Sequence, residues 1–163
     1  MSYSNKGFTR QEALIVLGVL VVLVVATIFS ISVSNKKARD AVRLSDVRRM
    51  SVAIEEANTK TPHAFVPGCT HSYAPTVSCI GDDGMFSLSD FVDPSDPVSP
   101  CLGNASGAVS DDVCAYSISS ADGKTQARLN DYQVCFFLEI GTSDYKKGIY
   151  RVENGGNISA GCN

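Results

Sequence analysis

The chain of 163 residues is long enough for one modest domain, but not for two domains with separate cores. Its formal net charge of −3 is unevenly distributed, with +1 over residues 1–33, +3 over residues 34–60 and −7 over residues 61–163. The acidic C-terminal part lacks the cationic surface that dominates affinity for nucleic acids, so we expect no direct nucleic acid binding.

An apolar run near the N-terminus predicts a membrane-spanning helix. Residues 13–29 read ALIVLGVLVVLVVATIF and carry no charge, and Ile31 and Val33 extend the run with only serines between them. A helix rises about 1.5 Å per residue, so about 20 residues cross a hydrocarbon core. Residues 13–33 are therefore long enough to span a bilayer. The run contains no proline, which leaves Gly18 as its only weak helical position.

The helix is expected to continue out of the membrane. Residues 35–59 contain no glycine or proline. Their apolar side chains recur at spacings of three and four, which predicts a buried stripe: Val47, Met50, Ile54 and Ala57. Residues 36–43 are charged on most sides, so we expect them to face solvent or neighbouring subunits rather than the core of their own chain. Pro62 is expected to end the helix.

The remaining residues predict a loop region followed by a small sheet. Residues 61–112 hold all six prolines and are expected to be irregular. Three strands are expected, at residues 113–119, 131–140 and 149–153. The second alternates most clearly, with one apolar face made by Tyr132, Val134, Phe136, Leu138 and Ile140. The fold class is therefore α+β, with a long N-terminal helix packed on a three-stranded antiparallel sheet.

Six cysteines follow the apolar run, and none of their spacings gives a CxxC pair: Cys69, Cys79, Cys101, Cys114, Cys135 and Cys162. This pattern indicates disulfides in an oxidising compartment, because a zinc site would show close-set ligands and His63 and His71 do not supply them. Among fifteen possible connectivities, loop closure favours sequential pairing, 69–79, 101–114 and 135–162. Cys135 faces away from the helix on its strand, which suits a bond to the C-terminal tail.

The residues directly before the apolar run are Lys6-Gly7-Phe8-Thr9-Arg10-Gln11-Glu12. This segment resembles the class III leader junction of type IV pilins and the related pseudopilins, and the resemblance extends over residues 6–29. It implies cleavage by prepilin peptidase after Gly7, N-methylation of Phe8 and retention of Glu12 as the fifth mature residue. The implied segments are a leader (1–7), a transmembrane and filament-core helix (8–34), its amphipathic continuation (35–60) and an extracytoplasmic head (61–163).

Glu12 has two possible roles. An ionisable group at the edge of a bilayer needs a partner, and the freed α-amino group of Phe8 on an incoming subunit can supply one during assembly. Alternatively, Glu12 is a carboxylate of the first helical turn, favoured there by the helix dipole.

The resemblance implies a structural subunit, a pilin or pseudopilin. The sequence contains no nucleophile-elbow, Walker or zincin pattern, so we expect no enzyme and no cofactor. Its expected partners are copies of itself or other pilins, prepilin peptidase, and the inner membrane before assembly into an extracellular or periplasmic filament. The positively charged leader is expected to stay in the cytoplasm, with the head outside. The alternative is a binding module that does not assemble, either anchored in the membrane or secreted after cleavage behind Val24-Val25-Ala26.

Acidic loops are weak candidates for a calcium site, because their spacing fits no EF-hand: Asp82, Asp83, Gly84, Asp93 and Asp96. The stretch 141–145 is better interpreted as a solvated turn, and no metal site is expected. Asn104 and Asn157 match the glycosylation sequon, which is short enough to occur by chance, and both are interpreted as surface loop residues.

Overall fold

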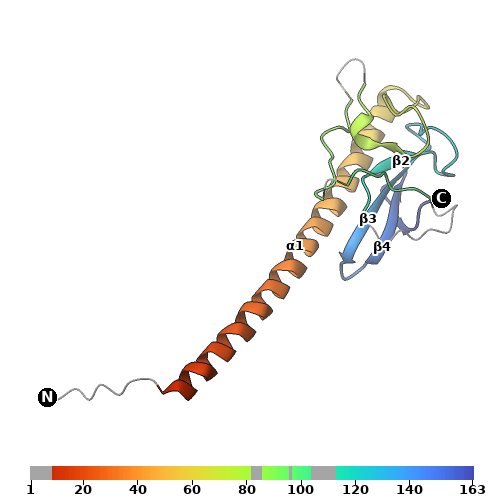
Figure 1. Ribbon diagram of the computed structural model, residues 1–163. Coiled ribbons are helices and arrows are strands. Elements are labelled where there is room, and N and C mark those ends of the chain that lie inside the picture. Colours follow the sequence, from red (N-terminus) through yellow and green to blue (C-terminus); the bar gives the residue numbers. More distant parts are fainter. Residues whose placement is uncertain (1–8, 82–85, 96, 104–112) are drawn as a thin grey trace. The chain divides into compact units, whose positions relative to one another are not determined.

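A computed structural model describes residues 9–81, 86–95, 97–103 and 113–163. The chain divides into two compact units, Met1–Lys36 and Lys37–Asn163. One helix, α1 (Arg10–Lys60), contributes to both units (Figure 1). It ends two residues before Pro62, whose ring disfavours helical geometry in the preceding residue. The long helix expected from the sequence is confirmed to within a residue or two at each end.

In the first unit, α1 is exposed on all sides. Every residue from Arg10 to Ala38 is solvent-accessible, and the helix runs without a break through Gly18 and Phe29. Among the residues that the structure describes, α1 is the one helix long and apolar enough to cross a membrane, judged by length and composition. A single N-terminal apolar helix of this kind is compatible with a membrane anchor.

The second unit contains a five-stranded sheet in which every strand is antiparallel to the next along the chain. Figure 1 shows β2, β3 and β4 side by side. The strands are β1 (Ala74–Pro75), β2 (Ser117–Ser119), β3 (Gln133–Gly141), β4 (Lys146–Glu153) and β5 (Ile158–Ala160). The α+β class is confirmed, but the expected number of three strands is wrong. β1 and β5 have only two and three residues, too few to show an alternating pattern.

The main core lies between the sheet and the second half of α1. Val47, Met50 and Ile54 are fully buried, and Ala57 packs at the edge of the cluster. The sheet contributes the residues that alternate along β3 and just before it: Tyr132, Val134, Phe136 and Leu138, all fully buried. Burying one large apolar side chain contributes about 1.5–3 kcal/mol, so this stripe is a principal source of stability for the head.

A second, smaller core covers the opposite face of β3. Cys135 and Phe137 alternate with the main-core residues and are also buried. They pack with Cys101, Cys114 and Cys162, and with the half-buried side chains of Tyr73, Val113 and Ile149. β3 is therefore covered on both faces, although its sequence predicts a strand with one apolar face.

The described parts of residues 61–103 are mostly irregular, as expected, with β1 and a short 3-10 helix, η1 (Thr76–Ser78). The disulfide Cys69–Cys79 links two cysteines of this segment that are 10 positions apart in the sequence. Gly68 has a positive φ of 74°, and a Cβ there would collide with backbone atoms of Ile80. Only glycine therefore fits where the chain passes this close to itself.

Candidate functional site

Thr9, directly before α1, and Glu12, in its first turn, are joined by reciprocal hydrogen bonds. The backbone N–H of Thr9 donates to Glu12 Oε2 at 2.9 Å, and the Thr9 hydroxyl donates to the same oxygen at 2.8 Å. The Glu12 N–H donates in return to Thr9 Oγ1 at 3.3 Å. This is a capping box, which satisfies backbone donors that the helix cannot pair. Gly7 and Phe8, the expected processing residues, lie outside the described residues.

The capping box bears on both roles of Glu12. Its carboxylate occupies the first helical turn, where a negative charge is favoured by the helix dipole, as the alternative interpretation supposes. Both bonds to Thr9 end on Oε2, so the cap does not use Oε1. A cation that approached the exposed Glu12 could bind this second oxygen while the cap stayed intact.

The apolar part of α1 has no cover within the described chain. Fifteen large apolar side chains between Leu14 and Val33 are exposed, among them Phe29 at 70% and Val22 at 67%. At about 1.5–3 kcal/mol for each side chain fully removed from water, their burial would contribute on the order of tens of kcal/mol. The segment therefore needs a non-aqueous environment, either lipid or other protein.

Thr27 is a polar residue within this apolar segment, and its side chain is satisfied locally. The Thr27 hydroxyl donates to the carbonyl oxygen of Leu23 at 2.5 Å and lies 3.1 Å from that of Val24. A hydroxyl that bonds back to its own helix leaves no unpaired donor for lipid to surround. The sequence of α1 is thus compatible with an apolar environment at this point too.

Arg43 lies at the centre of a buried ionic cluster in the second unit. Its guanidinium is fully buried and forms a two-pronged ion pair with Asp93, at 2.7 Å from Nε and 2.9 Å from Nη2. Nη1 donates to Asp40 Oδ1 and to Glu139 Oε1, both at 2.9 Å, and Nη2 also donates to Ser95. The expectation that residues 36–43 face away from their own core is therefore wrong for Asp40 and Arg43.

Asp40 joins the helix to the end of β3. Its side chain is fully buried and accepts three backbone N–H bonds at 2.9 Å, from Glu139, Ile140 and Gly141. The pairing of β3 with β4 shifts register between Leu138 and Gly141, so the sheet does not pair these amides in the regular way. Asp40 supplies the acceptors that the irregular strand end lacks.

Arg39 completes the cluster from its solvent side. It forms a second two-pronged pair, with both oxygens of Glu139 at 2.7 Å. Hydrogen bonds from Arg39 make the largest contribution to the pKa of Glu139, and they lower it. Burial acts in the opposite direction, but with the added effect of Arg43 the pKa falls to about 2. Burial alone would lower the pKa of Arg43, but its carboxylate partners raise it above the ordinary value. Glu139 and Arg43 thus stay charged at neutral pH.

The sequence contained one signal for this cluster. Asp40, Arg43, Leu44, Val47, Met50 and Ile54 follow one another at spacings of three, four and one, on the same helical face. Extending the apolar stripe toward the N-terminus would therefore have placed both charges in the core. Asp93, the partner of Arg43, lies 50 residues further along the chain and could not be found from helical spacing.

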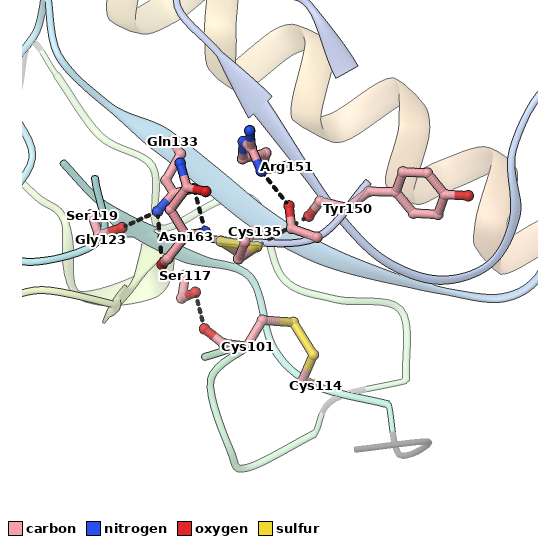
Figure 2. Close-up of a disulfide and its surroundings, with 12 residues drawn as sticks. Cys101, Cys114, Ser117, Ser119, Gly123, Gln133, Cys135, Tyr150, Arg151 and Asn163 are labelled. Atoms are coloured by element: carbon pink, nitrogen blue, oxygen red, sulfur yellow. Dashed lines mark hydrogen bonds between the residues drawn. A yellow bond between two sulfur atoms is a disulfide. The ribbon is translucent and has the colours of Figure 1, made fainter. Parts of the chain in front are cut away.

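The six cysteines form three disulfides, Cys69–Cys79, Cys101–Cys114 and Cys135–Cys162. These are the pairs that close the shortest loops. Figure 2 shows Cys135 beneath the sheet, close to Cys101–Cys114. The fully buried Gln133 donates to Ser119 Oγ at 3.1 Å and exchanges two bonds with the backbone of Asn163. Together with Cys135–Cys162, these bonds hold the C-terminal residues against β2 and β3.

Asp93 is not available as a metal ligand, because both of its oxygens bond Arg43. Asp82, Asp83, Gly84 and Asp96 lie outside the described residues, as does Asn104. Among the residues that are described, no group of three His, Cys, Asp or Glu side chains could hold a metal ion. The stretch 141–145 is a turn in which Thr142 and Tyr145 bond each other, and Asn157 is exposed between β4 and β5.

Comparisons with known proteins identify no relative of this chain: no family model, no curated protein and no solved structure matches it. The features that bear on function are therefore those of the chain itself. They are the exposed apolar segment of α1, the capped Glu12 directly before it, and a disulfide-bonded head.

Proposed function

We propose that this chain is a structural subunit of a type IV pilus-like filament, a pilin or pseudopilin, processed after Gly7 and N-methylated at Phe8. The observation that carries the proposal is the exposed apolar segment of α1 directly behind the junction Lys6-Gly7-Phe8-Thr9-Arg10-Gln11-Glu12. The segment would first lie in the inner membrane and then pass into a filament core made of the same segments of other subunits. Both environments would remove its side chains from water.

Glu12 would guide this assembly. In the mature chain Thr9 would be the second residue and would still cap α1. The α-amino group of Phe8 on an incoming subunit would approach Glu12 Oε1, which the cap leaves unused. A charged pair inside an apolar filament core has a large desolvation cost unless both partners meet, so this pairing would set the axial register of the subunits.

The head is proposed to lie outside the cytoplasm. Lys6 and the amino terminus make the leader positive, which favours its retention on the cytoplasmic side. All six cysteines are paired in the structure, and disulfides persist in oxidising compartments. The subunit would therefore be a single-pass protein before assembly, with prepilin peptidase and copies of itself or other pilins as partners.

One observation favours a second candidate, a binding module that does not assemble. The capping box explains Glu12 without any neighbour, because the carboxylate already has a helix-stabilising role in a single chain. The apolar segment would then serve only as a membrane anchor, or would be removed if the chain were secreted.

The mass of the mature N-terminus tests the proposal. The protein is extracted from membranes of a bacterium that has prepilin peptidase, and its N-terminal peptide is sequenced by mass spectrometry. We expect the peptide to begin at Phe8 with one added methyl group. In a Gly7→Leu variant we expect the full precursor, because the peptidase requires a small residue beside the bond it cuts. A wild-type terminus at Met1 or Thr27 would contradict the proposal.

A further inference from the structure

Two shallow hollows lie side by side along α1 in the unit Lys37–Asn163. The first has a volume of about 460 Å³ and is lined by Arg48, Arg49, Val52 and Phe91. The second has a volume of about 410 Å³ and lies between Ala57, Phe86 and other residues. Ala53 and Glu56 line both, so the hollows form one continuous groove along the helix.

Apolar side chains line the first hollow and a smaller hollow that shares Phe91 with it, and we call them the Val52 patch: Val52, Phe91, Val92 and Val98. Val52 is 64% exposed, Val92 is 49% exposed and Val98 is 99% exposed. Phe91, Val92 and Val98 line the smaller hollow, which has a volume of about 180 Å³. Phe91 is the residue that lines both hollows. A contiguous exposed apolar patch with a charged rim is typical of a protein interaction site.

Two arginines lie at the rim of the patch, and the one carboxylate that lines the first hollow, Glu56, forms an ion pair with Lys60. Arg48 and Arg49 are both exposed, and the Arg49 guanidinium lies 5.4 Å from the centre of the Phe91 ring. Within the part of the chain that the structure describes, no carboxylate lies within ion-pair distance of Arg48 or Arg49. Arginine is one of the residue types most enriched among the side chains that dominate binding energy at interfaces.

We propose that the Val52 patch binds the head of a second copy of this chain. This contact would add to any contact between the apolar segments of the two copies. Charge complementarity favours this occupant, because residues 61–163 carry twelve Asp or Glu against five Lys or Arg. A neighbouring acidic head would supply carboxylates within ion-pair distance, which Arg48 and Arg49 do not have among the described residues. The inference rests on the proposed function, which brings copies together.

Confinement strengthens the case for a second copy. Chains anchored through one membrane face each other at a high effective concentration, so a contact too weak to hold free heads together becomes significant. An exposed Val98 in a loop beside an apolar hollow is suited to such a contact, because it adds apolar area without a desolvation cost for polar groups.

A site-specific photo-crosslinker tests the contact in the full-length protein in bacterial membranes. The crosslinking residue replaces Val52 in one variant and Thr125, an exposed loop residue outside the patch, in the control. We expect the Val52 variant to form a covalent homodimer upon illumination, and the Thr125 variant to form at least fivefold less. Equal yields from the two positions, or capture of a different protein by the Val52 variant, would overturn the proposal.

A charge reversal tests the role of the rim. We expect R48E together with R49E to lower the crosslinking yield from position 52 by about fivefold to tenfold, because two rim ion pairs are lost and repulsion replaces them. The matched control is K124E with K146E, which changes the net charge equally at two exposed lysines outside the patch. If the two double variants behave alike, the arginines have no role and the proposed complementarity is wrong.

The same samples separate failure of this inference from failure of the proposed function. Folding is checked by the mobility of each variant on non-reducing gels, which reports the three disulfides. If the N-terminus is mature but Val52 forms no homodimer, the docking surface is wrong and the filament proposal stands. If the N-terminus is unprocessed, the filament proposal fails independently of any crosslink.

Discussion

Two parts of α1 place their side chains in opposite ways. Between Leu14 and Val33 the helix exposes fifteen large apolar side chains, whereas at Asp40 and Arg43 it buries two charges completely. Each arrangement contradicts the usual rule that apolar groups lie inside and charges outside. Whether a side chain is buried or exposed therefore depends on the partners available to it, and these partners differ between the two parts of one helix.

The first part has no partners among the described residues, and so requires lipid or other protein. The second part has a full set of partners, because Arg43 bonds three carboxylates and a serine hydroxyl while Asp40 accepts three backbone amides. Buried charges are tolerated when every hydrogen-bonding group is satisfied. The following predictions test whether the first part needs an apolar environment and whether the buried charges need their partners. They run from the largest expected effect to the smallest.

Substitutions of Glu12 separate its role in assembly from its role in capping. Glutamine keeps the capping box but removes the charge, whereas alanine removes both. If Glu12 pairs with the Phe8 amine of a neighbour, Glu12→Gln and Glu12→Ala should both lower the amount of sheared filament by about tenfold or more, with processing unchanged. Filament amounts near wild type for Glu12→Gln, with a fall only for Glu12→Ala, would show that the cap is what matters.

Loss of the central arginine should strongly destabilise the head. Arg43→Met leaves Asp40 and Asp93 buried without the cation that neutralises them, which should lower the free energy of unfolding by about 3–5 kcal/mol. The matched control is Arg39→Met, because the Arg39 side chain is 31% exposed and Glu139 keeps its bond to Arg43. The control should cost about 1 kcal/mol or less. Urea unfolding in detergent, followed by near-ultraviolet circular dichroism, measures both, and equal losses would contradict the buried role.

Removal of the disulfide that joins β3 to the C-terminal tail should have an intermediate effect. Replacing Cys135 and Cys162 together by serine should lower the free energy of unfolding by about 2–4 kcal/mol, through greater freedom of the unfolded chain. The bonds between Gln133 and Asn163 should still hold part of the tail. Hydrogen exchange at β5 and Asn163 measures this directly, and unchanged protection together with unchanged stability would contradict the prediction.

Glu139 should make a smaller, pH-dependent contribution. Its pKa is about 2 in the folded state and near 4.5 ordinarily, so the folded chain holds the ionised form more strongly than the unfolded chain does. This stability is fully present above about pH 4.5 and is lost as the pH falls toward 2. Unfolding measurements from pH 7 to pH 2 should show a smaller acid-induced loss in Glu139→Gln than in wild type. An identical loss would show that Glu139 is not held in the ionised form.

The sequence predicted the features that depend on local periodicity. The helix, its buried stripe at Val47, Met50 and Ile54, and the alternating strand β3 all follow from repeated spacing of apolar residues. The loop region and the end of α1 near Pro62 follow from the distribution of proline. These patterns are local, so the sequence alone contains them.

The features that depend on distant partners could not be predicted. Helical spacing could indicate that Arg43 is buried, but not that its partners are Asp93 and Glu139, which lie 50 and 96 residues away along the chain. Phe137 and Cys135 are buried by a second core that the irregular segment builds, and that segment has no periodic pattern. β1 and β5 are strands because they pair with β2 and β4, and their own sequences are too short to show a periodic pattern.

The bonds of Asp40 also determine where the chain tolerates a change in length. Because one carboxylate holds three successive amides of β3, the rotational phase of α1 is set at residue 40 relative to the sheet. One inserted residue turns a helix by about 100°, so an insertion between Asp40 and Val47 would point either the carboxylate or the apolar stripe away from the sheet. An insertion between residues 34 and 38 leaves that phase intact. The number of helical residues between the apolar segment and Asp40 can therefore change without disturbing how the rest of α1 packs on the sheet.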